Sequence, residues 1–315
     1  MHLRNNEPDA AFILKELTNS IRDRSDDVDL YLREGFMPIS EPMPDRFWET
    51  LGIHRLMFNS NHNKPAITDH WNTGSGNDNN VLNSWNRIKN DSIAEWLRAI
   101  LSDCSIIEFA DWTAVDDVSG FWDRLYCDVI KPLNKRDFQF IFHLRNTIKK
   151  PVFEVDEILD ILGDYSSYGT VTLVLHEDEA DMLWRRLNGQ NSGDFKSGFG
   201  SQETREKYLF LYNTIRIDVL LILHNNHAMV FSRDWQFDLV GGSLDSIHES
   251  LYALDSFTAG YQLGLLLQLQ IPHCIALGMA VSVVCKEYTS EHGSKALLAY
   301  MQDWMTELHP AKTLN

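Results

Sequence analysis

Three short apolar stretches decide the expected fold: SIIEFA at residues 105–110, FQFIF at 138–142 and TVTLVL at 170–175. Each is followed by a segment whose apolar residues recur at helical spacing, so strands and helices alternate. Such alternation predicts a β-α-β-α-β-α unit, and the lack of polar alternation inside the runs predicts strands covered on both faces. We therefore expect an α/β (or α+β) fold with this unit in the middle of the chain, at 104–188.

The flanks of this unit predict three further parts. Residues 1–103 are expected to be a helical and irregular N-terminal region, with a helix at 7–24, scattered prolines and an Asn/Gly-rich loop at 72–80. Residues 189–200 form a Gly/Ser-rich linker or loop. Residues 201–315 form a helix-rich C-terminal unit with a hairpin around Asn225-Asn226, which either stands alone or completes one domain with 104–188.

The charge balance is strongly acidic. The 315 residues contain 28 Lys and Arg against 45 Asp and Glu, which gives a formal charge of -17. This balance repels phosphate backbones and no dense basic run offsets it, so we expect no nucleic-acid partner. The N-terminus lacks the apolar stretch of a secretory signal. Four cysteines without C-x-x-C spacing indicate buried free thiols in the cytoplasm: Cys104, Cys127, Cys274 and Cys285.

One segment is long and apolar enough to raise the question of a membrane span. No charged residue lies between Asp255 and Lys286. Glutamines, a proline and a histidine interrupt the segment, and no Lys/Arg cluster marks a cytoplasmic flank. We therefore expect two buried helices that meet at Ile271-Pro272 and no membrane span.

No strong catalytic motif is present, but three apolar runs end at or beside a histidine. His143 and His176 follow two strands of the expected unit, and Asp111 follows another. Since ligands sit outside the carboxyl ends of strands in open α/β sheets, Asp111, His143, His176 and Glu177 form one candidate catalytic site. Imidazoles and carboxylates together suit a divalent metal that activates water, as in a metal-dependent hydrolase. The alternative is that each histidine is simply the first polar residue after a core strand.

A second histidine pair flanks the expected hairpin turn. His224 and His227 would face each other across the hairpin and are candidate metal ligands. No third ligand is evident nearby, so the alternative is a solvated hairpin tip.

Acidic residues dominate the region between Pro151 and Asn188, which holds nine acids and two bases. Glu177, Asp178 and Glu179 also suit the first turn of a helix, where they meet the positive end of its dipole. The remaining acids would form a surface that attracts a basic protein partner, with two tryptophans beside the Asn/Gly-rich loop as contact residues. The candidate partner-binding residues are Glu154, Asp156, Glu157, Asp160, Asp181, Trp71 and Trp85.

Two functions follow from these features. The first is a soluble cytoplasmic interaction protein, of the immunity, regulatory or chaperone-like type, that binds a basic partner and is not an enzyme. It needs no cofactor. The second is the metal-dependent hydrolase, which would need a divalent metal.

Overall fold

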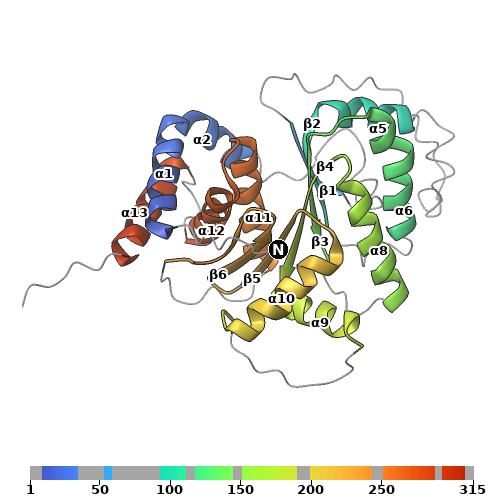
Figure 1. The fold of residues 1–315 in the computed structure, drawn as a ribbon. Helices are drawn as coiled ribbons and strands as arrows, with labels where there is room; N and C mark the ends of the chain where they lie inside the picture. The colour runs from blue at the N-terminus through green and yellow to red at the C-terminus, as the bar shows by residue number, and fades with distance from the viewer. Residues whose placement is uncertain are drawn as a thin grey trace, which may run out of the picture. The chain divides into compact units, whose positions relative to one another are not determined.

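A mixed sheet of seven strands organises the chain (Figure 1). The computed structural model describes residues 9–34, 53–58, 93–110, 118–144, 151–189, 199–242, 251–287 and 293–308. The strands are hydrogen-bonded to one another in chain order. They are β1 (Ile53–Phe58), β2 (Cys104–Phe109), β3 (Phe138–His143), β4 (Gly169–His176), β5 (Val219–His224), β6 (His227–Ser232) and β7 (Gln236–Val240).

The expected α/β fold is confirmed, with β2, β3 and β4 parallel to one another. Two strands were not expected: β1, which lies in the stretch predicted to be irregular, and β7. Both occupy edges of the sheet and both pair antiparallel with their neighbours. β7 has the five-residue sequence QFDLV, and β1 carries a histidine and an arginine in IHRLMF, so both give a weaker strand signal than a more apolar run such as VLLILH of β5.

The described chain divides into two compact units that are interleaved along the sequence. One comprises residues 38–196 and 206–220, and the other comprises residues 1–37, 197–205 and 221–315. The domain boundaries expected at 103/104, 188/189 and 200/201 are not tested by this division and stay predictions.

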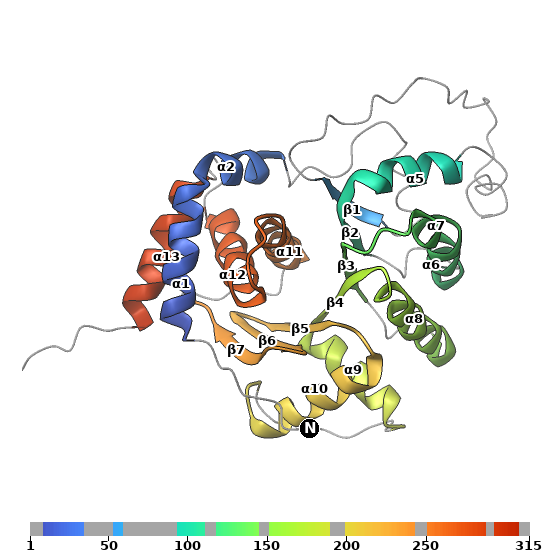
Figure 2. The same ribbon diagram turned by 45° about the horizontal axis from the view of Figure 1, so that its top comes forward.

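In the unit that contains β2–β4, helices cover one face of the strands (Figure 2). These helices are α5 (Ile93–Asp103), α6 (Val118–Leu125), a π-helical turn (Tyr126–Ile130), α7 (Lys131–Leu133) and α8 (Val152–Tyr165). A fully buried aromatic cluster fills the space beneath them. Phe109 stacks on Phe142 with ring centroids 4.5 Å apart, and Trp122 and Tyr165 meet these rings edge-on. The Tyr165 hydroxyl donates to the Trp122 carbonyl at 2.9 Å, so this buried polar group is satisfied.

The same unit continues with α9 (Glu177–Leu187) and most of α10 (Gln202–Ile215). His176 is the N-cap of α9, and its backbone N–H donates to the Glu179 carboxylate at 2.9 Å. This capping box and the acidic first turn place carboxylates at the positive end of the helix dipole, as the sequence predicts.

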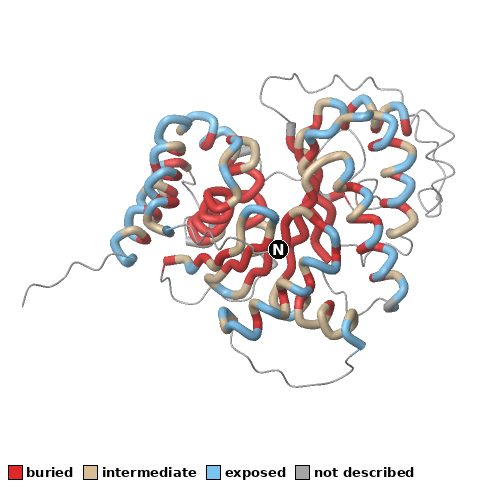
Figure 3. The backbone as a smooth tube through the Cα atoms, in the orientation of Figure 1, coloured by how far each residue is buried: buried red, intermediate tan, exposed pale blue. Residues whose placement is uncertain are grey.

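In the other unit, two apolar helices pack against each other with unusually close backbones: α11 (Leu251–Leu266) and α12 (Ile271–Glu287). A Cβ at Gly264 would lie 2.7 Å from the Cys274 Cα, and one at Gly260 would lie 2.8 Å from the Gly278 Cα. Only glycine permits this approach. Most of α12 is buried (Figure 3). The predicted helix pair meeting at Ile271-Pro272 is therefore confirmed, and among the described helices none is long and apolar enough to cross a membrane.

Helices from the two ends of the chain pack together in this unit: α1 (Ala10–Asp23), α2 (Ser25–Glu34) and α13 (Ser294–Leu308). Three charged side chains of the N-terminal pair reach later helices. Arg24 donates to the Leu267 carbonyl at the end of α11 at 2.7 Å, and Asp29 accepts from the Ser294 N–H at the start of α13. Glu16 lies 3.1 Å from His273 Nε2 near the start of α12. The Arg24 guanidinium thus lies at the C-terminus of α11, and the Asp29 carboxylate lies at the N-terminus of α13. Each pairs with a backbone group that has no hydrogen-bond partner within its own helix.

Two of the three cysteines with described side chains fit the expectation of buried free thiols, and one does not. Cys104 and Cys274 are buried and free, whereas Cys127 is exposed on the π-helical turn. Burial raises the pKa of the Cys104 thiol to about 12, so it stays protonated at neutral pH. The side chain of Cys285 lies outside the described residues.

Replacing Asp29 with alanine should lower the free energy of unfolding by about 1 kcal/mol, because the first turn of α13 loses its cap. Asp29→Asn should keep most of the stability, since an amide oxygen still accepts from the Ser294 N–H. Urea unfolding followed by circular dichroism measures both variants. Asp303→Ala, on the exposed side of α13, is the matched control and should change stability little. Equal losses in the alanine and asparagine variants of Asp29 would contradict the capping role.

Candidate functional site

Three charged or polar side chains form a buried row across three neighbouring strands. Glu108 on β2 bridges Arg55 on β1 and His143 on β3 through its two carboxylate oxygens. Glu108 Oε2 lies 3.3 Å from Arg55 Nη1, and Oε1 lies 3.2 Å from His143 Nε2. The side chains of Glu108 and His143 are each 1% exposed and that of Arg55 is 8% exposed. We call Arg55, Glu108 and His143 the ionic row.

The strand register explains why these residues share one face of the sheet. Arg55 pairs with Glu108, and Glu108 pairs with Ile141, which lies two residues before His143. Residues two apart on a strand, and residues paired across strands, point to the same side. Thr172 on β4, which is also buried, pairs with Ile141 and extends the polar face by one strand. The intervening residues Phe109 and Phe142 belong to the aromatic cluster on the opposite face.

The ionic row lies at the carboxyl ends of parallel strands. Glu108 is the last residue but one of β2, and His143 is the last residue of β3. This edge is where open α/β sheets bind their ligands. Guanidinium, carboxylate and imidazole groups together offer several hydrogen-bond donors and acceptors, which suits a ligand that carries hydroxyl groups.

The free-energy cost of burying charged groups also indicates that the ionic row has a function. Taking two charges out of water costs several kcal/mol per ion, and apolar side chains of similar volume are often at least as stabilising as a buried ion pair. A buried charged group at the ligand-binding edge of a sheet is therefore a candidate functional site.

The expected catalytic residues that the structure describes lie at the ends of β3 and β4 and at the start of α9. His143 does lie at the carboxyl end of its strand, but its observed partner is Glu108, which the sequence analysis did not select. His176 caps α9 and lies 4.0 Å from the exposed Asp178 carboxylate, and Glu177 is the first residue of that helix. Asp111 lies outside the described residues.

The expected metal sites receive no support from the described residues. In that part of the chain, no group of three or more His, Cys, Asp or Glu side chains is placed to hold a metal ion. At the hairpin, His224 and His227 contact the Phe199 ring, with centroid distances of 5.2 Å and 5.8 Å. The two histidines are thus partly buried against an aromatic ring, and their role as metal ligands stays a prediction.

The acidic residues expected to bind a partner fall into two groups. Asp156, Glu157 and Asp160 are exposed on α8, and Glu154 is half-buried. Asp181 on α9 is different: it accepts hydrogen bonds from Lys207 and from the Tyr208 hydroxyl of α10. Lys207 therefore compensates the charge of Asp181 within the same unit, and a partner-binding role of Asp181 stays a prediction. Trp71 and Trp85 lie outside the described residues.

The residues that the sequence analysis missed did leave a signal. Glu108 is a carboxylate inside the otherwise uncharged run SIIEFA, and Arg55 stands inside IHRLMF. A charge inside a strand with no polar alternation must be buried, and a buried charge needs a partner. The pairing itself depends on β1 lying beside β2, which local sequence does not reveal.

No family model matches the chain, and no curated protein matches it. Among solved structures it is similar to a ribokinase from Thermotoga maritima, at 11% identity over 64% of this chain and 58% of that chain, with a TM-score of 0.45. It is also similar to Trypanosoma brucei brucei adenosine kinase, at 12% identity over 64% and 56% of the two chains and a TM-score of 0.45.

A third similar structure is the Arabidopsis thaliana ribokinase complexed with ribose and ATP, at 15% identity over 66% of this chain and 59% of that one, with a TM-score of 0.44. In all three, the matched region spans little more than half of the other protein's length. The fold of this chain is a mixed seven-strand sheet flanked by helices.

The functions expected from the sequence disagree with the names of these structures. The similar structures are kinases, whereas the sequence led to a non-enzymatic interaction protein of the immunity, regulatory or chaperone-like type, with a metal-dependent hydrolase as the alternative. The disagreement has a physical reason: net charge governs solubility and long-range steering, but it does not determine a fold or the chemistry that the fold supports. The basic protein partner itself stays a prediction.

Removing Glu108 alone should be costly. Glu108→Ala leaves the Arg55 and His143 side chains buried without their shared carboxylate, and we expect the free energy of unfolding to fall by about 3–5 kcal/mol. The double variant Arg55→Met with Glu108→Leu removes both charges and should lose clearly less. Urea unfolding of both variants tests this order. If the double variant were the less stable of the two, the row would not behave as a buried ion pair.

Proposed function

We propose that the protein is a phosphotransferase that places a hydroxyl-bearing small molecule, of the sugar or nucleoside class, at the carboxyl ends of β2–β4. The observation that carries this proposal is the ionic row, a charged donor and acceptor set kept at the ligand-binding edge of the sheet despite its cost in burial. The names of the similar structures, ribokinase and adenosine kinase, supply the classes of compound to test first.

The ionic row has the chemistry to hold a neutral polyol. The Glu108 carboxylate accepts hydrogen bonds from hydroxyl groups, and the Arg55 guanidinium donates them. The Thr172 hydroxyl, on the neighbouring strand, does both. Since Arg55 and Glu108 already neutralise each other, this pair carries no net charge. In the proposed reaction the ligand hydroxyl oxygen forms a bond to the γ-phosphorus of a nucleoside triphosphate, the bond from that phosphorus to the leaving nucleoside diphosphate breaks, and the hydroxyl proton is released to solvent.

The nucleotide and its Mg²⁺ enter this proposal as a co-substrate complex. Mg²⁺ in phosphoryl transfer is usually held by one or two carboxylates together with the phosphate oxygens. We assign no residue of this chain to it.

We place the protein in the cytoplasm. Cys104 and Cys274 are free and buried in the structure, and Cys127 is free and exposed. Exposed free thiols persist in a reducing compartment. The formal charge of -17 also argues against a nucleic-acid partner, since it repels phosphate backbones.

Thermal unfolding of the full chain with a panel of neutral sugars and nucleosides, each with and without MgATP, tests the proposal. We expect at least one compound to raise the melting temperature, because a ligand that binds only the folded state stabilises it. The same compound should stimulate ADP release in a coupled assay. The variant Arg55→Met with Glu108→Leu should lose both effects.

The matched control replaces another ion pair of the same unit, Asp181→Asn with Lys207→Met, which lies on α9 and α10. It should keep the ligand effects of the natural protein. If the compound still raised the melting temperature and ADP release of the Arg55→Met, Glu108→Leu variant, the ionic row would not be the binding site. Binding without stimulated ADP release would overturn the phosphotransferase assignment.

A further inference from the structure

The pairing of β1 with β2 changes register twice along one short strand. At the start of β1, Ile53 lies opposite Phe109, and at its end Phe58 lies opposite Cys104. These two pairs belong to one regular antiparallel register, because equal numbers of residues separate them on the two strands. Between them, residues 55–57 are displaced from that register by one residue.

Two β-bulges of opposite effect bracket the displaced residues. The first lies on β1, where Ile53 and Arg55 are two residues apart but oppose neighbouring residues of β2. The second lies on β2 between Cys104 and Ile106, which are two residues apart but oppose neighbouring residues of β1. The second bulge cancels the first, so only the middle of β1 is slipped and its ends stay in the regular register.

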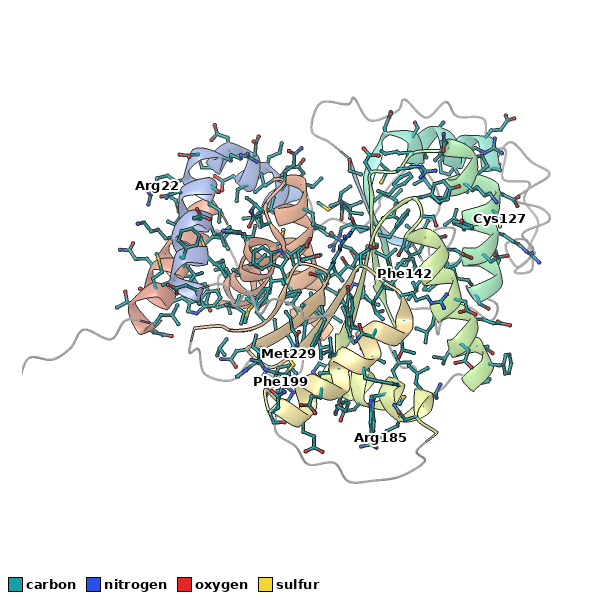
Figure 4. All side chains as sticks on the ribbon, viewed as in Figure 1. Arg22, Cys127, Phe142, Arg185, Phe199 and Met229 are labelled. Carbon is teal, nitrogen blue, oxygen red and sulfur yellow. The ribbon has the colours of Figure 1, made fainter. Side chains whose placement is uncertain are left out.

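The slip decides which face of the sheet Arg55 occupies. In the regular register Arg55 would lie opposite Ile107 and would share the face of Phe109, because residues two apart on a strand point to the same side. That face holds the buried aromatic cluster, whose member Phe142 is labelled in Figure 4. The observed slip instead puts the Arg55 guanidinium 3.3 Å from the Glu108 carboxylate.

The slipped register is favoured because of these two charges. A β-bulge leaves a residue unpaired in the ladder, so the two bulges together cost about two hydrogen bonds. The net contribution of a hydrogen bond is small compared with the cost of burying a guanidinium among aromatic rings while Glu108 loses its cation. β1 is also an edge strand of the described sheet, so its middle can slip without disturbing a strand on its other side.

We propose that the Arg55–Glu108 pair is a register lock, which holds the middle of β1 one residue out of the regular register and thereby assembles the ionic row. As a statement about ligand binding, this inference rests on the proposed function, whereas the register itself is measured without ligand. When an apolar side chain replaces the guanidinium, the regular register becomes the more stable one. Its ladder is complete, and no charged group enters the aromatic face.

Disulfide trapping in the full chain tests the lock. Leu56 lies opposite Ile107 in the observed register and would lie opposite Ile106 in the regular one. Since Ile106 and Ile107 point to opposite faces, a cysteine at position 56 can bond to only one of them in each register. On mild oxidation, Leu56→Cys with Ile107→Cys should form at least about tenfold more disulfide than Leu56→Cys with Ile106→Cys. Peptide mass mapping separates this bond from those of the natural cysteines.

Adding Arg55→Met to both cysteine pairs should invert this preference. Arg55→Lys is the matched control: it keeps a cation opposite Glu108 and should leave the preference unchanged. Because cysteines in the core can impair folding, cross-strand nuclear Overhauser contacts measure the register of the Arg55→Met chain without added cysteines.

The lock is wrong if the Arg55→Met chain keeps Leu56 opposite Ile107 in these contacts, or if Arg55→Lys inverts the preference as well. Failure of the proposed function gives a different result. The register would still respond to Arg55→Met, but no sugar or nucleoside would raise the melting temperature of the natural protein.

Discussion

A single carboxylate connects the three strands at the candidate site. Glu108 holds Arg55 on one side and His143 on the other, all inside the protein, where a charge without a partner would cost several kcal/mol. This requirement fixes the register of β1 against β2 and the orientation of the last residue of β3. It also divides the strands into two chemically different faces: aromatic rings pack under α6 and α8, and charged groups lie on the opposite side. The candidate site depends on that division.

The unit that contains both ends of the chain is stabilised in a different way. Its apolar helices α11 and α12 pack through glycines, and their close approach buries most of both helices. The open backbone groups at the helix ends must still be satisfied. Side chains from residues 16–29 do this at two of these ends, and a third pairs with His273 near the start of α12. The N-terminal helices are therefore an integral part of this unit's core, although their sequence predicts only a surface helix.

Function is where inference from composition failed. A formal charge of -17 and an acidic stretch led to the expectation of a docking surface, yet Asp181 is satisfied by Lys207 and Tyr208 of a neighbouring helix. Charges that are close in sequence need not form one surface, because each helix places them on a different side. The buried charges of the ionic row direct attention from the surface of the helices to the edge of the sheet. The ionic row consists of three residues, and they lie at the edge where open α/β sheets bind ligands.

The sequence by itself determined the central strands, the helices between them, the hairpin at Asn225-Asn226 and the helix pair around Pro272, because each of these depends on local periodicity and turn chemistry. It also indicated His143 as a residue at a strand end. Only the tertiary structure decided that Arg55 and Glu108 are its companions, that Phe199 lies on His224 and His227, and that β1 and β7 close the sheet at its edges. These contacts join residues that are distant in the chain, such as Arg55 and Glu108. The choice of partner rests on strand register and on the burial of charge, which no short window of sequence contains.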